Sequence, residues 1–236
     1  MLPRKLGLIF PPAGRGVPEE GLAMYGGNID YLVETLGLKT MNPDGYDAVT
    51  GLIGQRAEQL AARGAEAVVL MGTSLSFYKG EAFNQSLTQA MQSSCGLPCI
   101  TMSSAVIDGL RSVDADSVAV ASAYNDTVND RLRAFLMEHG FTVLAVQGLG
   151  IEAVEDIFNV KQPQLVAFCA GVVASVRGAD ALLVSCGGLR TLEILMPLEG
   201  LTGIPAISST PHALFAGANL LGLDARVTGC GRLLSG

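Results

Sequence analysis

Residues 96–101 read Gly-Leu-Pro-Cys-Ile-Thr, and a near copy, Gly-Ile-Pro-Ala-Ile-Ser, stands 107 residues later at 203–208. Upstream of each copy, an apolar run ends in small residues: Leu-Met-Gly-Thr-Ser at 70–74 and Val-Ser-Cys-Gly-Gly at 184–188. These echoes occur in the same order and predict two similar halves. The alternative is that Gly-x-Pro turns simply recur before the strands of any α/β protein.

A third echo and the alternation of apolar and helical segments support the first interpretation. Leu6–Phe10 pairs with Val118–Ser122 in the same order as the other two echoes. Short, wholly apolar runs of this kind are typical of buried parallel strands. The expected strands are Leu6–Phe10, Ala67–Met71, Cys99–Met102, Ser117–Ser122, Phe141–Val146, Ala181–Ser185 and Ala206–Ser208, and the expected helices include Tyr46–Arg63, Asn84–Ser94, Asn125–His139 and Gln164–Arg177. Strand–helix alternation predicts an α/β fold with parallel sheets.

The repeat also divides the chain. We expect an N-terminal α/β lobe over residues 1–114 and a C-terminal α/β lobe over 115–211, with segment 212–236 packing back on the first lobe. Two equivalent halves place one ligand site at their interface, near the carboxyl ends of both sheets.

Composition excludes several classes of function. Of the 236 residues, 49% are hydrophobic and 16% charged, and the formal net charge is −7. A chain of this composition can bury a core, and it lacks the basic surface that a nucleic-acid partner requires. The first apolar run stops at Pro11-Pro12, too short for a signal-peptide core, and no apolar stretch is long enough for a membrane span. We therefore expect a cytoplasmic protein with no membrane partner.

The cysteines and histidines do not predict a metal site. The five cysteines stand at 95, 99, 169, 186 and 230 without paired spacing, and His139 and His212 are far apart in the sequence. This pattern fits a reducing compartment and argues against both a disulfide framework and zinc. No Gly-x4-Gly-Lys-Ser/Thr loop is present, so a P-loop nucleotide site is excluded. The sequence predicts no cofactor.

Cys186 differs from the other four cysteines. It directly follows an apolar strand and precedes Gly187-Gly188, which open the next segment. A side chain there lies at the carboxyl end of the sheet, and the glycines let a ligand approach the backbone N–H groups closely. The corresponding turn of the first half, Gly72-Thr73-Ser74, offers two hydroxyls and no thiol.

Several motifs together resemble the arylmalonate decarboxylase branch of the aspartate/glutamate racemase superfamily. They are Met-Gly-Thr-Ser-Leu-Ser-Phe-Tyr at 71–78, Gly-Leu-Pro-Cys at 96–99, Ala-Tyr-Asn-Asp at 123–126, Ser-Cys-Gly-Gly-Leu at 185–189 and Pro11-Pro12. The resemblance covers nearly the whole chain. It implies two pseudo-symmetric lobes, each with a parallel sheet of about four strands flanked by helices, and an active site between them.

The sequence also departs from the racemases of that superfamily in a way that bears on activity. Those racemases place one cysteine on each side of the substrate, at positions matching Gly72 and Cys186, and this chain keeps only the second. They also carry an acidic residue after the first strand, where this chain has Pro11-Pro12. Both departures favour decarboxylation over two-base racemisation.

The resemblance implies a cofactor-free decarboxylation of a 2-aryl or alkenyl malonate, a small dicarboxylate, to an enantioenriched acid. An enediolate forms and Cys186 protonates it. The implied dioxyanion hole consists of Thr73, Ser74, Tyr124 and Gly187, with backbone N–H groups of Ser74, Cys186 and Gly187 as further donors. The expected pocket residues are Pro11, Pro12, Leu38, Tyr46, Gly72, Leu75, Val154, Ile157 and Gly188.

Other functions remain open at this point. One is an isomerase or racemase of the same superfamily acting on a small carboxylic acid. Another is a serine hydrolase that uses Ser74 as its nucleophile, and a third is a binding protein for small acids without turnover. The sequence predicts neither the oligomeric state nor the handedness of the product.

Overall fold

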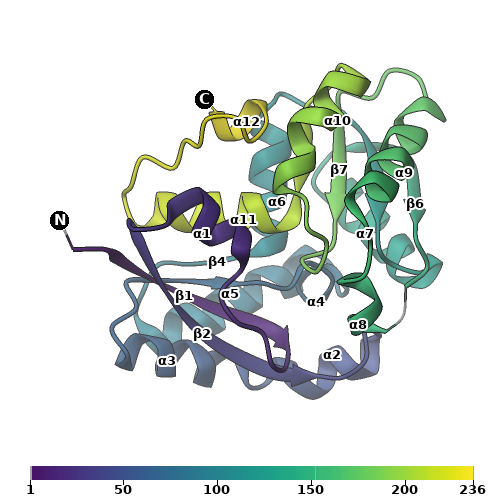
Figure 1. Cartoon of the computed structure of the whole chain (residues 1–236). Helices are drawn as coiled ribbons and strands as arrows, with labels where there is room; N and C mark the ends of the chain where they lie inside the picture. The colour runs from purple at the N-terminus through teal and green to yellow at the C-terminus, as the bar shows by residue number, and fades with distance from the viewer. Residues whose placement is uncertain (1, 152, 236) are drawn as a thin grey trace.

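The computed structural model describes residues 2–151 and 153–235, apart from the side chain of Val154. Within these residues the strands form two separate four-stranded sheets, one in each half of the chain. Figure 1 shows the first sheet in the lower half of the molecule and the second in the upper right.

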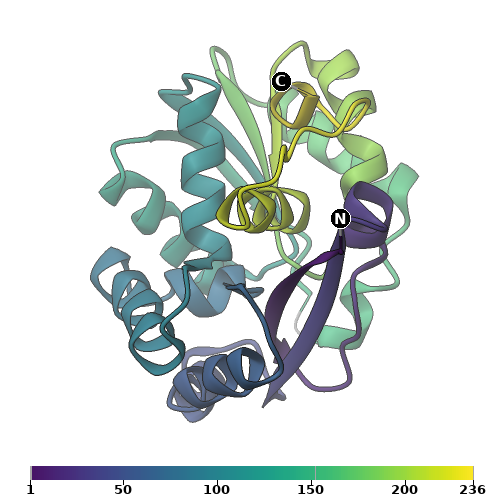
Figure 2. The ribbon, with the colours of Figure 1, turned by 90° about the vertical axis from the view of Figure 1, so that its left-hand side faces the viewer.

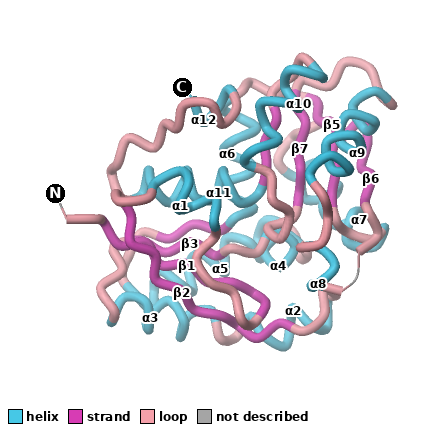
Figure 3. Tube along the Cα trace, viewed as in Figure 1, coloured by secondary structure: helices cyan, strands magenta, loops and turns pink. Residues whose placement is uncertain are grey.

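Both sheets are parallel and have the same strand order. The first runs β2 (Ile29–Leu38), β1 (Arg4–Pro12), β3 (Ala67–Leu70), β4 (Cys99–Thr101), and the second runs β6 (Thr142–Gly148), β5 (Ser117–Ser122), β7 (Ala181–Ser185), β8 (Ala206–Ser208). Three of the four strand pairs (β1 with β5, β3 with β7 and β4 with β8) are those that the sequence echoes predict, and the predicted two-lobed α/β fold is confirmed. Figure 3 shows both sheets among the surrounding helices.

Helices follow most strands and cover the sheets. They are α1 (Glu19–Tyr25), α2 (Pro43–Thr50), α3 (Ile53–Ala62), α4 (Thr73–Phe77), α5 (Glu81–Cys95), α6 (Met102–Ser112), α7 (Asp126–Glu138), α8 (Val154–Ile157), α9 (Gln162–Ala174), α10 (Leu195–Thr202), α11 (Ser209–Leu220) and α12 (Arg232–Ser235), with a 3-10 turn at Leu192–Ile194. Side-chain caps start several of them: Asn42, Thr101 and Asn125 each accept a hydrogen bond from a backbone N–H of the first turn. None of the described helices combines the length and apolarity needed to cross a membrane.

Two local expectations were wrong. The sequence analysis has no strand at Ile29–Leu38, because Asp30, Glu34 and Thr35 interrupt the apolar run; as an edge strand, β2 leaves much of its surface half-exposed. The expected helix Tyr46–Arg63 is two helices, α2 and α3, which the Gly51-Leu52 turn separates.

The helix after each sheet contacts the other half of the chain. A Cβ added to Gly217 in α11 would lie 2.7 Å from Leu6 of β1 and 3.0 Å from Val69 of β3. A Cβ added to Gly109 in α6 would lie 3.2 Å from Ile207 of β8. Figure 2 shows α11 in the middle of the molecule between the two sheets. These contacts pack each of the two helices against a strand of the other half.

Candidate active site

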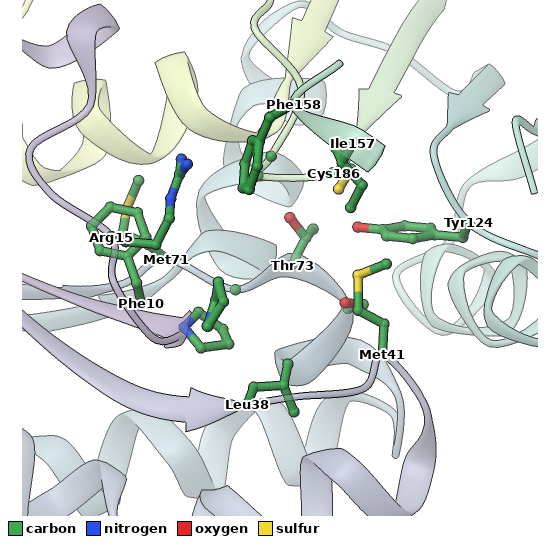
Figure 4. A pocket seen from close by; sticks show the side chains of 16 residues that line it. Phe10, Arg15, Leu38, Met41, Met71, Thr73, Tyr124, Ile157, Phe158 and Cys186 are labelled. Atoms are coloured by element: carbon green, nitrogen blue, oxygen red, sulfur yellow. The ribbon is translucent and has the colours of Figure 1, made fainter. Parts of the chain in front are cut away.

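A cavity lies where the carboxyl ends of strands from both sheets meet. It comprises about 490 Å³ of space, part of which is open solvent. Its described lining residues are Phe10, Pro11, Pro12, Arg15, Leu38, Met41, Met71, Gly72, Thr73, Ser74, Tyr124, Ile157, Phe158, Cys186, Gly187 and Gly188. Figure 4 shows how their side chains converge.

The strands explain why distant residues meet here. Central strands β3 and β7 are fully buried, and each is followed at once by a small-residue turn that faces the other lobe. The turn after β3 carries Gly72 and Thr73, and the turn after β7 carries Cys186 and Gly187. The ends of β1 and β5 add Pro11 and Tyr124.

Cys186 is a buried thiol with an unusual backbone. Its side chain is 6% exposed, and its φ of 157° is rare for residues other than glycine. Burial raises the pKa of the thiol; the N–H groups of Gly188 and Leu189, the Tyr124 hydroxyl and the Arg15 charge act in the opposite direction. The raised pKa keeps Cys186 protonated at neutral pH, and a protonated thiol can act as a general acid.

Ser209 connects the two turns, which the sequence analysis did not anticipate. The backbone N–H of Cys186 donates to Ser209 Oγ at 3.2 Å, and the Thr73 hydroxyl lies 2.9 Å from the same oxygen. The expectation that the Cys186 N–H is free for a ligand is therefore wrong. Because hydroxyl hydrogens rotate, Ser209 can donate to Thr73 and leave the Thr73 hydrogen for a bound carboxylate.

Tyr124 presents its hydroxyl to the cavity from the end of β5. The ring is 2% exposed and lies edge-on to Phe77, at 5.9 Å between ring centroids. Ser185 Oγ donates to the Tyr124 hydroxyl at 3.5 Å, and burial raises the pKa of this phenol well above its usual value. Tyr124 therefore remains a neutral hydrogen-bond donor at any working pH.

Three glycines keep the cavity open. A Cβ on Gly72 would collide with the ring of Pro11, one on Gly188 would lie 2.8 Å from Ile157, and one on Gly187 would lie 3.1 Å from Met102. Among the described hydrogen bonds, none uses the Gly187 N–H, so that donor is available to a ligand.

Eleven of the fourteen expected site residues line the cavity. Cys186 lines it together with Pro11, Pro12, Leu38, Gly72, Thr73, Ser74, Tyr124, Ile157, Gly187 and Gly188. Tyr46 and Leu75 are fully buried and are not among the lining residues: Leu75 lies next to Gly72, and the Tyr46 ring packs against Tyr78 with its hydroxyl near Ser74. Val154 begins α8, and its side chain lies outside the described part of the chain.

The sequence analysis missed five lining residues. Met71, Phe10 and Phe158 are each adjacent in sequence to an expected residue, so chain continuity could have indicated them. Met41 and Arg15 follow strand ends in loops, and no local pattern shows that they turn toward the cavity.

Metal-ligating side chains do not gather in the described structure. No group of three or more His, Cys, Asp or Glu residues with suitable geometry for a metal ion is present among the residues described. The donors at the cavity are hydroxyls, backbone N–H groups, one thiol and the Arg15 guanidinium, which suit a carboxylate ligand.

Fold and site together define a two-lobed α/β enzyme with one cysteine between its lobes. Comparison with known proteins specifies the family: the arylmalonate decarboxylase family model matches residues 6–234. An arylmalonate decarboxylase of Bordetella bronchiseptica is 42% identical over 229 residues, which is 97% of this chain and 95% of that protein. This chain belongs to the arylmalonate decarboxylase family.

Solved structures agree with this assignment. A crystal structure of arylmalonate decarboxylase has a TM-score of 0.89 and 42% identity, covering 98% of each chain. The maleate isomerase Iso from Pseudomonas putida S16 has a TM-score of 0.90 at 20% identity, covering 99% of this chain and 98% of its own, which shows a shared fold.

Proposed function

We propose that this protein decarboxylates a malonate carrying an aryl or alkenyl group at C2 and releases one enantiomer of the resulting acid. The observation that carries the proposal is a single buried thiol, Cys186, facing a cavity in which the pseudo-symmetric position is Gly72. Membership of the arylmalonate decarboxylase family supports the same reaction.

The retained carboxylate of the substrate is the electron sink. When the bond between C2 and the departing carboxylate breaks, its electron pair moves into the retained carboxylate and forms an enediolate. In this proposal the hydroxyls of Thr73, Ser74 and Tyr124 and the N–H of Gly187 donate to its two oxygens; all four residues line the cavity. Fixed donors aimed at developing charge stabilise a transition state more than they stabilise the substrate.

The departing carboxylate lies against apolar side chains in this proposal. Leu38 and Met41 lie together on one side of the cavity, at and beyond the end of β2 (Figure 4). A carboxylate held there loses its hydration, whereas the neutral carbon dioxide that it becomes does not need any.

Cys186 completes the reaction. Its S–H proton passes to C2 of the enediolate, which leaves a thiolate and the monocarboxylate product, and solvent then reprotonates the sulfur. Because the only thiol of the described lining stands on one face of the planar intermediate, the proton arrives from that face. A racemase or isomerase that moves protons on both faces would need a second acid, and Gly72 supplies none.

Decarboxylation of phenylmalonate tests the proposal directly. The purified protein should release carbon dioxide and phenylacetate, and dialysis against a strong chelator should leave the rate unchanged. Chiral analysis of the product from 2-methyl-2-phenylmalonate should show one enantiomer in excess. Ester hydrolysis that depends on Ser74 but not on Cys186, without carbon dioxide release, would instead indicate a serine hydrolase.

The pH dependence should reflect the buried thiol. Since the reaction needs the protonated form and burial raises the pKa of Cys186, kcat should stay constant through neutral pH and fall only above the ordinary thiol value of about 8.5. Thiolate absorbance in the wild type and in Cys186→Ser identifies the group that titrates. An alkaline limb below about 8.5 would contradict the assigned protonation state.

Thr73→Ala should lower kcat by about 10²–10³-fold, because it removes one preorganised donor to the enediolate. Thr73→Ser keeps the hydroxyl and the contact with Ser209, and it should retain most of the activity. Steady-state kinetics with phenylmalonate provide the comparison. Equal losses in both variants would show that packing of the methyl group, and not the hydroxyl, matters.

A further inference from the structure

Arg15 is the single charged side chain among the described lining residues of the cavity. It lies in the loop after β1, and in Figure 4 it occupies the side of the cavity opposite Tyr124, with Phe158 between Arg15 and Cys186. The hydroxyl donors and the cation therefore lie at opposite ends of the same cavity.

The guanidinium group has no anionic partner in the described structure. None of the ion pairs or hydrogen bonds of the described residues uses Arg15. The nearby Glu20 is committed elsewhere, because its Oε1 accepts from the backbone N–H groups of Thr191 at 2.8 Å and Leu192 at 2.9 Å. Arg190, by contrast, pairs with Glu19 at 2.8 Å.

Two aromatic rings hold the guanidinium group in place. It lies 4.3 Å from the ring centroid of Phe158 and 5.7 Å from that of Phe10. Stacking of this kind orients the planar group and leaves its N–H edge free for a bidentate partner such as a carboxylate. Burial also lowers the pKa of Arg15, which shows that the charge is partly desolvated and would gain from a bound anion.

The cavity is also open beyond Arg15. A second cavity adjoins the first and shares Phe10, Arg15, Phe158, Gly187 and Gly188 with it. A substituent longer than a phenyl ring therefore has room to extend past Phe158 toward the guanidinium group.

We propose that Arg15 determines substrate specificity by binding a carboxylate at the far end of the C2 substituent. The inference rests on the proposed function. The preferred substrate is then a malonate whose aryl or alkenyl arm ends in a third carboxylate. Its reacting end binds the donors around Thr73 and Tyr124. Its apolar arm lies along Phe10 and Phe158, and its terminal carboxylate pairs with Arg15. Because the chain has a net charge of −7, its overall charge does not attract such an anion, and the attraction must come from the local charge of Arg15.

An effect of Arg15 on the thiol is the competing role. Burial is the largest influence on the pKa of Cys186, and the Arg15 charge is the weakest of the contributions that lower it. A specificity role and a thiol-tuning role make different predictions, because only the first depends on what the substrate carries at its far end.

The test compares kcat/KM for 4-carboxyphenylmalonate and phenylmalonate in the wild type, Arg15→Gln, Arg15→Lys and Arg190→Gln. The wild type should prefer the carboxylated substrate, mainly through a lower KM. Arg15→Gln should reduce that preference by about 10- to 100-fold, as expected for loss of a charged hydrogen-bonded pair, and Arg15→Lys should reduce it less. Arg190→Gln, which removes a paired arginine of the adjoining cavity, should leave the preference unchanged.

An unchanged preference in Arg15→Gln, or equal losses for both substrates together with a shifted alkaline limb, would overturn the inference. Calorimetric binding of 4-carboxyphenylacetate and phenylacetate separates this result from a failure of the proposed function. Tighter binding of the carboxylated acid that depends on Arg15 supports the inference even without turnover. Decarboxylation of phenylmalonate without any such preference upholds the function and refutes the role of Arg15.

Discussion

Cys186→Ala is expected to lower kcat for phenylmalonate by about 10²–10⁴-fold while the protein remains folded, because the variant removes the general acid of the reaction. No second acid faces the same side of the intermediate among the described lining residues, and the Tyr124 hydroxyl, whose pKa burial raises, is a poor proton donor. The donors around the retained carboxylate stay in place, so substrate binding should change much less than turnover. Steady-state kinetics and thermal unfolding measure the two effects separately.

Cys169→Ser is the matched control for this variant. Cys169 is fully buried in α9 and does not line the cavity, and burial raises the pKa of its thiol to about 12. A hydroxyl at that position lowers stability, since it is buried in an apolar environment, and leaves kcat of the folded protein near the wild-type value. A comparable loss of kcat in folded Cys169→Ser would contradict the assignment of Cys186 as the proton donor.

Gly72→Cys combined with Cys186→Ser is expected to invert the handedness of the product. Gly72 lies in the turn after β3 as Cys186 lies in the turn after β7, and both line the same cavity from opposite lobes. A thiol at position 72 therefore faces the other side of the enediolate and delivers its proton there.

The inverted enzyme should be slow. A Cβ at position 72 collides with the Pro11 ring, so the end of β1 must shift before the new thiol can face the substrate. Gly72→Cys alone should lower the enantiomeric excess, since both faces then have a proton donor. Chiral chromatography of the product from 2-methyl-2-phenylmalonate measures the ratio of the two enantiomers. Unchanged handedness in an active double variant would mean that the two turns do not flank the substrate.

The sequence by itself determined the two-lobed fold, because its evidence is local and repeated. The turns at 70–74 and 184–188, with the Gly-x-Pro segments that follow each, recur in the same order, and buried parallel strands have an apolar signature that does not depend on distant contacts. Cys186 was identified in the same way, from a thiol directly after such a strand. The edge strand β2 lacked this signature, since residues on both of its faces are partly in contact with water.

Only the tertiary structure decided which side chains share the cavity and which donors are already in use. Ser209 begins α11, 23 residues beyond Cys186 and 136 beyond Thr73, and it bonds both because the helix crosses between the sheets. Tyr46 and Leu75 are fully buried and are not among the residues that line the cavity, and Arg15 reaches the cavity from a loop. Such placements depend on how loops and crossing helices bring remote parts of the chain together, and a local sequence pattern carries no information about that packing.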